Sequence, residues 1–227
     1  MKGRNLENRL GVFVVVALFF GIGTTAFAAD VIFHEPFDDL DSDTFEVWGT
    51  AEPFNRVEVF EGSLELEGSN GFEAFGAYFT PEFDLANGPL TIEVEITRRS
   101  AIQGSEINIW YVNQYLVDGD PWMEGDFVRV GLFSEREGSQ NALLVQQHSP
   151  DARGQGEVLA VKGNAFEMGE PFTVRIELSA SEYAVSIDGE QMLSGAHDLP
   201  ATGGYLFIHD WNSVDSIDEI HDVKVRQ

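Results

Sequence analysis

Short segments in which apolar and polar residues alternate run through most of the chain. Residues 91–97 read Thr-Ile-Glu-Val-Glu-Ile-Thr, with the three aliphatic side chains at every second position. Residues 128–132, 172–178 and 183–187 follow the same period of two. Because successive side chains of an extended strand point to opposite faces, this period predicts half-buried β-strands.

Further strands are predicted where short apolar runs stand between turn residues, at 57–60, 63–67, 74–79, 106–112, 143–148, 158–161, 204–209 and 222–226. Asp188-Gly189 directly follows one predicted strand and is a hairpin signal. No window shows the sustained 3.6-residue period of an amphipathic helix. The chain is therefore predicted to be all-β, an antiparallel two-sheet β-sandwich of the jelly-roll kind with little helix.

The first 28 residues have a different character. Three bases, Lys2, Arg4 and Arg9, precede an uncharged apolar run at 11–23, and Ala26-Phe27-Ala28 fits a small-x-small cleavage site. These features predict a signal peptide over 1–28, one β-sandwich domain over 29–227, and a secreted or periplasmic protein. An uncleaved N-terminal anchor is the rival interpretation. We expect no membrane span after signal cleavage, since no later segment reaches about 20 apolar residues.

Composition narrows the classes of function. The chain has no cysteine, which excludes disulfides, thiol catalysis and thiolate metal sites. It carries 39 acidic residues against 13 basic ones, a net charge of −26, and loss of residues 1–28 would leave the remainder more acidic still. Such a surface repels nucleic acid and anionic lipid, so no nucleic-acid partner is expected. With 18 phenylalanines and 43% apolar residues, the chain can form a core.

The order of the segments carries a family resemblance. Phe33-His34-Glu35-Pro36-Phe37-Asp38-Asp39 stands near the start with Trp48 soon after, and the later segments are 61–66, 172–177, 183–190, 203–206 and 220–225. This succession resembles the concanavalin A-like lectin/glucanase superfamily in its laminin G-like forms, across essentially all of residues 29–227. The resemblance implies a jelly roll. It leaves function open, because this fold serves lectins, carbohydrate-binding modules, hydrolases, lyases and adhesion domains.

The glycosidases of this superfamily carry Glu-x-Asp, followed by another Glu, on one strand. In the closest segment, 106–111, Glu106 matches the first position, Asn108 stands where Asp would be, and Trp110 or Tyr111 replaces the second Glu. A glycosidase needs two carboxylates flanking one bond, and one carboxylate cannot serve as both acid and nucleophile. Laminarinase-type hydrolysis is therefore not expected from this segment.

The sequence gives little support for other catalytic arrangements. Jelly-roll polysaccharide lyases pair Tyr or His with Arg and Gln, and Arg98, Arg99 and Gln146-Gln147-His148 are residues of that type without the expected motifs. The histidines show no HxH or HExxH spacing, and no nucleophile elbow is present. An enzyme, a glycoside hydrolase or polysaccharide lyase using Glu106 or His148, stays an alternative.

A glycan-binding protein needs less, namely aromatic planes and hydrogen-bonding side chains. Period two places Glu106, Asn108 and Trp110 on one strand face, and Arg129 lies on the polar side of its own strand. Trp122 follows Asp120-Pro121 in a predicted loop, and Trp211 lies in or beside another. Burial against the sandwich is the competing interpretation for each tryptophan. We expect a secreted, non-catalytic, lectin-like domain that binds a glycan or polysaccharide; a structural or adhesion domain that binds protein is a further alternative.

A structural calcium ion is also expected. Members of the superfamily often tie the first strand to the last with calcium, and by position the resemblance points to Glu35 and Asp222, with a carbonyl near Gly62. The acidic run at 38–43 lacks the glycine and terminal Glu of an EF-hand. The alternative is that these carboxylates are ordinary solvated acids.

Overall fold

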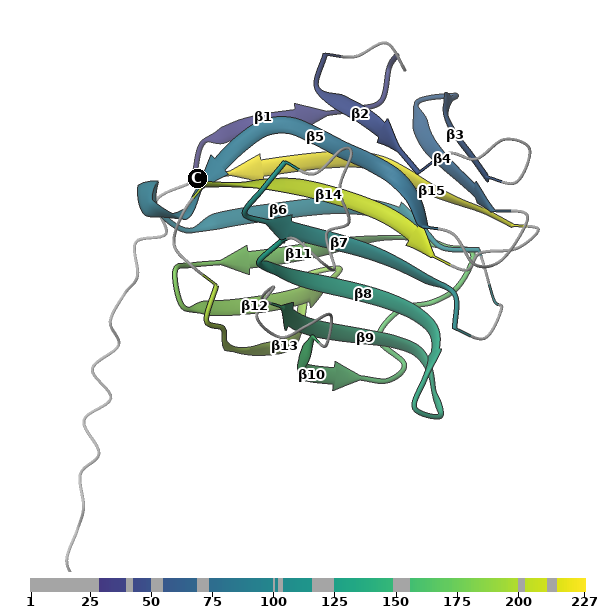
Figure 1. The fold of residues 1–227 in the computed structure, drawn as a ribbon. Coiled ribbons are helices and arrows are strands. Elements are labelled where there is room, and N and C mark those ends of the chain that lie inside the picture. The colour runs from purple at the N-terminus through teal and green to yellow at the C-terminus, as the bar shows by residue number, and fades with distance from the viewer. Residues whose placement is uncertain are drawn as a thin grey trace, which may run out of the picture.

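The computed structural model describes residues 29–39, 43–49, 55–68, 74–99, 101, 104–115, 125–148, 156–199, 203–211 and 216–227. The predicted signal peptide, residues 1–28, and Trp122 lie outside the described residues. The described strands form two antiparallel sheets that lie face to face (Figure 1). No helix in this part of the chain is long and apolar enough to cross a membrane.

The first sheet, sheet A, contains both ends of the described chain. Its strand order is β13-β12-β11-β6-β15-β4-β3, and β1 pairs with β15. The strands are β1 (Val31–Glu35), β3 (Asn55–Phe60), β4 (Ser63–Gly68), β6 (Leu90–Thr97), β11 (Pro171–Leu178), β12 (Glu182–Ile187), β13 (Glu190–Ala196) and β15 (Ser216–Arg226).

The second sheet, sheet B, has the order β10-β9-β8-β7-β14-β5-β2. The strands are β2 (Phe45–Trp48), β5 (Ala74–Asp84), β7 (Glu106–Val112), β8 (Phe127–Arg136), β9 (Ser139–His148), β10 (Glu157–Lys162) and β14 (Gly203–Trp211). The helical content of the described residues is one 3-10 turn, η1 (Leu85–Asn87). The prediction of an all-β sandwich is confirmed.

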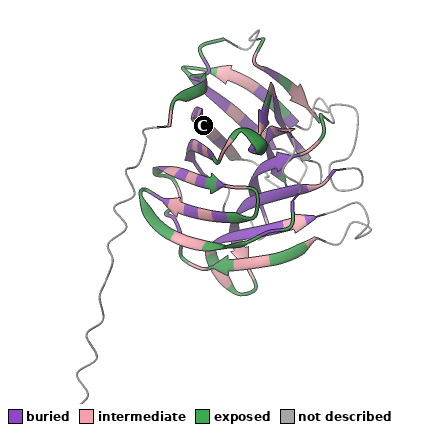
Figure 2. Cartoon of the chain, turned by 90° about the vertical axis from the view of Figure 1, so that its left-hand side faces the viewer, coloured by how far each residue is buried: buried purple, intermediate pink, exposed green. Residues whose placement is uncertain are grey.

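The hydrophobic core fills the space between the two sheets (Figure 2). Sheet A contributes Ile92, Val94 and Ile96 from β6, the residues that alternate in the sequence, and β7 of sheet B contributes Ile107 and Ile109. Burying each such side chain contributes about 1.5–3 kcal/mol. Because these positions point inward, the intervening residues of sheet B must point to the opposite side.

Two-residue turns connect several neighbouring strands. Asp188 and Gly189 join β12 to β13, and both have positive φ, 49° and 81°. Glu61 and Gly62 join β3 to β4 in the same way, at 50° and 83°. Positive φ at both central residues is the type I′ geometry, which matches the right-handed twist of a hairpin. The hairpin predicted at Asp188-Gly189 is therefore present.

A buried ion pair of sheet A is hydrogen-bonded to the residue that precedes a strand of sheet B. Arg98, which follows β6, pairs with Asp218 of β15, and neither side chain has exposed surface. The Arg98 Nη2 also donates to Ser105 Oγ at 2.8 Å, directly before β7. Removing one partner of such a pair would leave an uncompensated buried charge, so the pair holds Arg98 in place for its hydrogen bond to Ser105.

Candidate functional site

The outer face of sheet B, the side turned away from sheet A, brings together most of the predicted ligand-binding residues. Glu106, Asn108 and Trp110 lie on this face of β7, because Ile107 and Ile109 occupy the core. Arg129 lies directly opposite Trp110 on β8, and Trp211 lies opposite Glu106 at the end of β14. The two neighbours of β7 therefore supply the rest of the site.

Arg129 is the centre of a polar cluster on this face. Its Nη1 donates to Asn108 Oδ1 at 2.8 Å and reaches the two Glu106 oxygens at 3.3 and 3.4 Å. Its Nε donates to Gln146 Oε1 at 2.8 Å, from β9. One guanidinium on β8 thus orients side chains from both neighbouring strands, β7 and β9.

This cluster is almost closed to solvent. Arg129 is 4% exposed, and Asn108 has no exposed surface. Burial lowers the pKa of Arg129, while the neighbouring Glu106 carboxylate opposes that shift. The ion pair therefore keeps a charge in a place where an unpaired one would be costly. Asn108 Nδ2 has no hydrogen-bond partner among the described residues, so the cluster keeps one unused donor.

A row of aromatic rings continues from the polar cluster across the face. The Arg129 guanidinium lies 5.7 Å from the centre of the Trp110 ring, and His209 lies 5.1 Å beyond it. Phe207 stacks on His209 at 5.1 Å and on Tyr78 at 4.1 Å. The row then reaches three further rings, Tyr115, Tyr205 and Trp48.

The aromatic side chains in the middle of this face, its floor, are buried, whereas those at its two ends are exposed. Trp110 has no exposed surface, so it can support a ligand only from beneath. Trp211 at one end is 36% exposed and Tyr115 at the other is 37% exposed. Tyr205 and Trp48 are partly exposed. A planar ligand would therefore find its stacking surfaces at the two ends, with the buried rings holding them apart.

The two histidines of this face are held by the surrounding structure. Burial lowers the pKa of His209 to about 3, so this imidazole is neutral at ordinary pH. The His148 Nδ1 lies 3.2 Å from the Gly125 carbonyl oxygen, and its ring stacks on Phe127 at 4.8 Å. A neutral, stacked His209 is poorly suited to proton transfer near neutral pH.

Neither described residue directly across from Glu106 is a carboxylate, since these are Phe133 on β8 and Trp211 on β14. Glu135 lies two residues beyond Phe133 on the same face of β8, and its carboxylate accepts a hydrogen bond from Gln140 at 3.2 Å. Glu46 lies opposite Tyr78 on β2, three strands from β7, which is about 14 Å at the usual strand spacing. Glycosidase pairs lie roughly 5 to 9.5 Å apart, so Glu106 and Glu46 do not match that geometry.

The residues of the lyase alternative are also separated. Gln146 and His148 lie on the outer face of sheet B, but Arg98 is buried against Asp218 and Ser105. Arg99 Nη2 donates to both carboxylate oxygens of Glu219 on β15, at 2.8 and 2.7 Å. Neither arginine joins the Gln146 cluster, where Arg129 stands instead.

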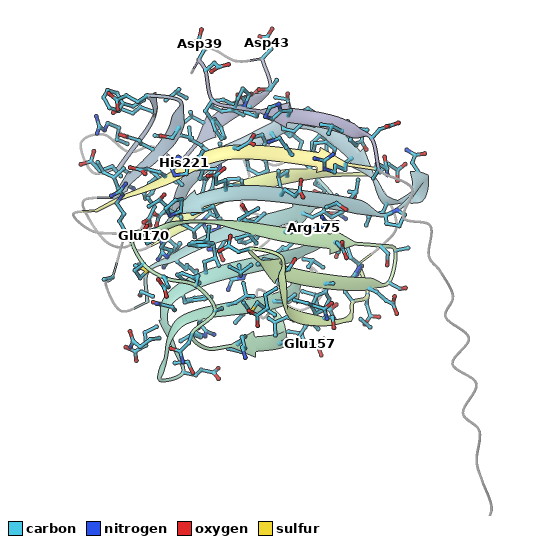
Figure 3. The ribbon with its side chains drawn as sticks, turned by 180° about the vertical axis from the view of Figure 1, so that it is seen from behind. Asp39, Asp43, Glu157, Glu170, Arg175 and His221 are labelled. Atoms are coloured by element: carbon cyan, nitrogen blue, oxygen red, sulfur yellow. The ribbon has the colours of Figure 1, made fainter. Side chains whose placement is uncertain are left out.

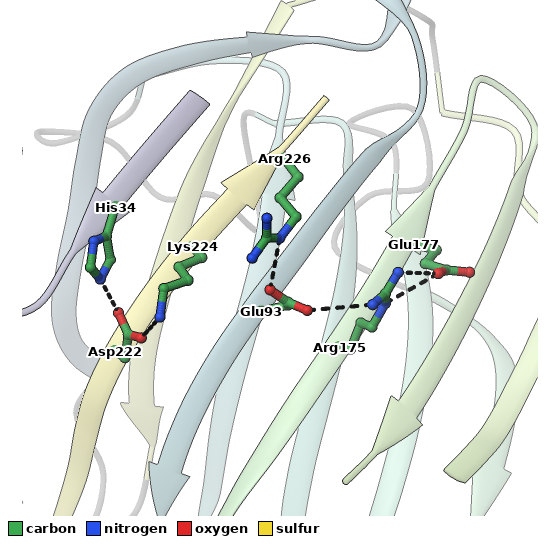
Figure 4. Close-up of polar contacts among 7 residues, drawn as sticks. All are labelled: His34, Glu93, Arg175, Glu177, Asp222, Lys224 and Arg226. Carbon is green, nitrogen blue, oxygen red and sulfur yellow. Dashed lines mark hydrogen bonds and ion pairs between the residues drawn. The ribbon is translucent and has the colours of Figure 1, made fainter. Parts of the chain in front are cut away.

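The two predicted calcium ligands have other contacts. Glu35 is buried and accepts hydrogen bonds from the Phe37 amide, at 2.8 Å, and from Thr44. Asp222 faces the other side of sheet A, where it binds His34 at 2.7 Å and Lys224 (Figure 4). The two carboxylates do not point toward each other, and a calcium ion at either one stays a prediction.

Comparisons with solved structures agree on the fold. No protein-family model and no curated protein matches the chain. A Bacillus subtilis protein of unknown function with a galectin-like fold is 11% identical, with a TM-score of 0.67 over 87% of this chain and 96% of that one. A Bacillus licheniformis β-glucanase is 12% identical, with a TM-score of 0.62 over 86% and 97%.

A third similar structure is the carbohydrate recognition domain of Emp46p, 12% identical, with a TM-score of 0.62 over 81% of this chain and 88% of that one. The chain thus has the concanavalin A-like jelly-roll fold expected from its sequence. These similar structures include both a carbohydrate recognition domain and a glucanase, so the fold by itself does not choose between binding and hydrolysis.

Sequence reasoning missed several members of the face. Tyr115, which is 37% exposed, and Tyr205, which contacts it, were not among the predicted ligand-binding residues. Gln146, which the sequence offered only for the lyase alternative, and His209 complete the buried floor. The alternation of side chains along β14 could have placed Tyr205, Phe207 and His209 on the outer face, because they alternate with core residues. Nothing in the local sequence marks Tyr115.

Proposed function

We propose that this protein binds neutral glycans on the outer face of sheet B and does not cleave them. Trp211 and Tyr115 stack on sugar rings, and Glu106 and Gln146, the least buried members of the Arg129 cluster, hydrogen-bond the sugar hydroxyls. Trp110 supports this surface from below. Residues 1–28 support the further proposal that the protein is exported.

The observation that carries the proposal is the pairing of accessible aromatic ends with a polar centre on one sheet face. Tyr205 and Trp211 are separated along β14 by about 20 Å, at roughly 3.3 Å per residue, which leaves room for several sugar rings. The ion pair with Glu106 neutralises Arg129. Together with the net charge of −26, this favours an uncharged ligand over an anionic one.

The test is a calorimetric titration of the full chain with a panel of neutral oligosaccharides. Trp211→Ala and Tyr115→Ala should each weaken binding about tenfold, because each removes a stacking plane. Phe60→Ala is the matched control, since Phe60 is 52% exposed on β3 of the other sheet and should not matter. Failure to bind any member of the panel, or wild-type affinity in both variants, contradicts the proposal.

Hydrolysis or lyase activity is the competing function, and the same glycan panel tests it. Incubation followed by a reducing-end assay should give no new ends, since Glu106 has no carboxylate across from it. New reducing ends that disappear in Glu106→Gln would make the protein an enzyme and overturn the non-catalytic half of the proposal.

A further inference from the structure

We propose that two copies of this chain associate edge to edge through β10 in an antiparallel, two-fold symmetric pair. β10 is the outermost strand of sheet B and pairs with β9 on one side (Figure 1). Its other side pairs with no strand of the described residues. The backbone groups of an edge strand are a template for a further strand.

The side chains of β10 favour such pairing. Val158 is 41% exposed and Val161 is 37% exposed. A β-bulge between Val158 and Ala160 places Val158 opposite Gln146 and Val161 opposite Leu144. Gln146 and Leu144 both lie on the outer face of sheet B, so the bulge brings two exposed valines to the same face. In a regular strand, residues three apart would point to opposite faces.

The sequence of β10, Glu-Val-Leu-Ala-Val-Lys, complements itself when it is read against a reversed copy. In full overlap, Glu157 faces Lys162 of the second copy, and Val158 faces Val161 of the second copy. Leu159 then faces Ala160. Opposed residues of an antiparallel pair point to the same face, so both the apolar and the charged partners match. A two-fold axis repeats every pair, which is the requirement for a closed dimer.

The two outermost strands of sheet A, β13 and β3, lack this property. In the same full-overlap register, β13 would place Glu190 opposite Ala196 and Gln191 opposite Gly195. β3 would place Arg56 opposite Val59 and Val57 opposite Glu58. Neither strand matches charge with charge or apolar with apolar. Figure 3 shows Glu157 at the margin of the molecule, far from Asp39 and Asp43.

Two features oppose association and set its strength. A β-bulge and a lysine on an edge strand both discourage pairing with another strand. The net charge of −26 also repels a second copy of the chain. One strand pair also buries less than the roughly 1,200 Å² of a standard interface. We therefore expect a dissociation constant on the order of tens of micromolar, with tighter association at high salt because salt screens the long-range repulsion.

The pairing would place the outer faces of two copies of sheet B on the same side of the dimer. Gln146 lies on β9, next to β10, and Arg129 lies on β8, one strand further. The polar clusters of the two copies would therefore lie on one continuous face. The inference does not depend on glycan binding, and its test measures molecular mass without any sugar present.

Sedimentation velocity of the full chain, over about 5 to 500 µM, tests the dimer. Lys162→Glu and Glu157→Lys should each weaken association about tenfold, because each opposes two pairs of like charges across the two-fold axis. The double variant, with both changes, should recover the wild-type constant because the charges again match. Glu61→Lys is the control: it makes the same charge change as Glu157→Lys, but in the β3–β4 turn of sheet A, away from β10.

A monomer at every concentration and salt level overturns the proposal. Dimers that are equally stable in both single variants would show that a different surface associates. A double variant no better than the single variants would mean that Glu157 and Lys162 do not face each other. Each of these results leaves the glycan proposal unaffected.

Discussion

At the scale of single residues, Arg129 decides what the outer face of sheet B can do. It holds Glu106, Asn108 and Gln146 in one orientation, and it lies against the Trp110 ring. A buried guanidinium with three acceptors fixes geometry, and the same contacts occupy the Glu106 carboxylate. The arrangement thus favours recognition over acid–base chemistry.

The neutral imidazole of His209 gives a prediction about pH. Burial lowers its pKa to about 3, whereas a histidine in an unfolded chain titrates near 6.5. Between these values the unfolded state binds more protons, so the contribution of this group to stability falls as pH falls from about 6.5 toward about 3. This contribution to the free energy of unfolding changes by at most about 1.4 kcal/mol per pH unit. In His209→Phe, which keeps a ring beside Phe207, urea unfolding between about pH 4 and 7 should show a shallower loss of stability.

Phe207→Leu is the control for that measurement. It disturbs the same stack of rings without removing a titratable group, so its pH slope should equal that of the wild type. Equal slopes in His209→Phe and the wild type would show that His209 does not resist protonation in the folded state.

At the scale of elements, the strands predicted best are those with one face in the core. β6, β7, β11 and β12 follow the alternation of the sequence, because packing against the other sheet fixes which residues are apolar. β13 was missed because it lies at an edge, where neither face is fully buried and its residues do not alternate. β2 was also missed, and it too lies at the edge of its sheet.

The candidate site was predictable to the same degree. Alternation on β7 correctly placed Glu106, Asn108 and Trp110 on one side, since it follows from strand geometry alone. The burial of Trp110 results from Phe127 and Phe207, which reach it from neighbouring strands. No local pattern contains that information, so the sequence named Trp211, one accessible end of the face, but not Tyr115, the other.

The close approach of β5 and β14 gives a prediction at this scale. A Cβ added at Gly76 would overlap the Ile208 carbonyl oxygen and lie 2.6 Å from His209 Cα. Both are backbone atoms that cannot retract without breaking the pairing, so Gly76→Ala should cost about 3 kcal/mol or more. Gly203→Ala, on β14, meets only the end of the flexible Glu82 side chain and should cost less than about 1 kcal/mol. Chemical unfolding of both variants measures this, and equal losses would contradict it.

At the scale of the whole molecule, two electrostatic effects act in opposite directions. The net charge of −26 repels itself throughout the folded chain. Against it stands a row of ion pairs on the outer face of sheet A, in which Glu93 binds both Arg175 and Arg226 (Figure 4). Arg175 also binds Glu177 at 2.7 Å. Salt weakens both effects, so their balance determines how stability responds to it.

We expect the repulsion to dominate. Exposed ion pairs contribute about 0–1 kcal/mol each, and the pairs in this row are partly exposed, whereas the excess negative charge is spread over the entire surface. Raising NaCl from about 0.05 M to about 1 M shortens the screening length from more than 10 Å to about 3 Å and should raise the melting temperature by several degrees. Glu93→Gln, which removes the shared carboxylate, should show a larger rise, because less attraction remains for salt to weaken. Calorimetry of both proteins measures the response, and a melting temperature that falls with NaCl would show instead that the ion pairs hold the fold together.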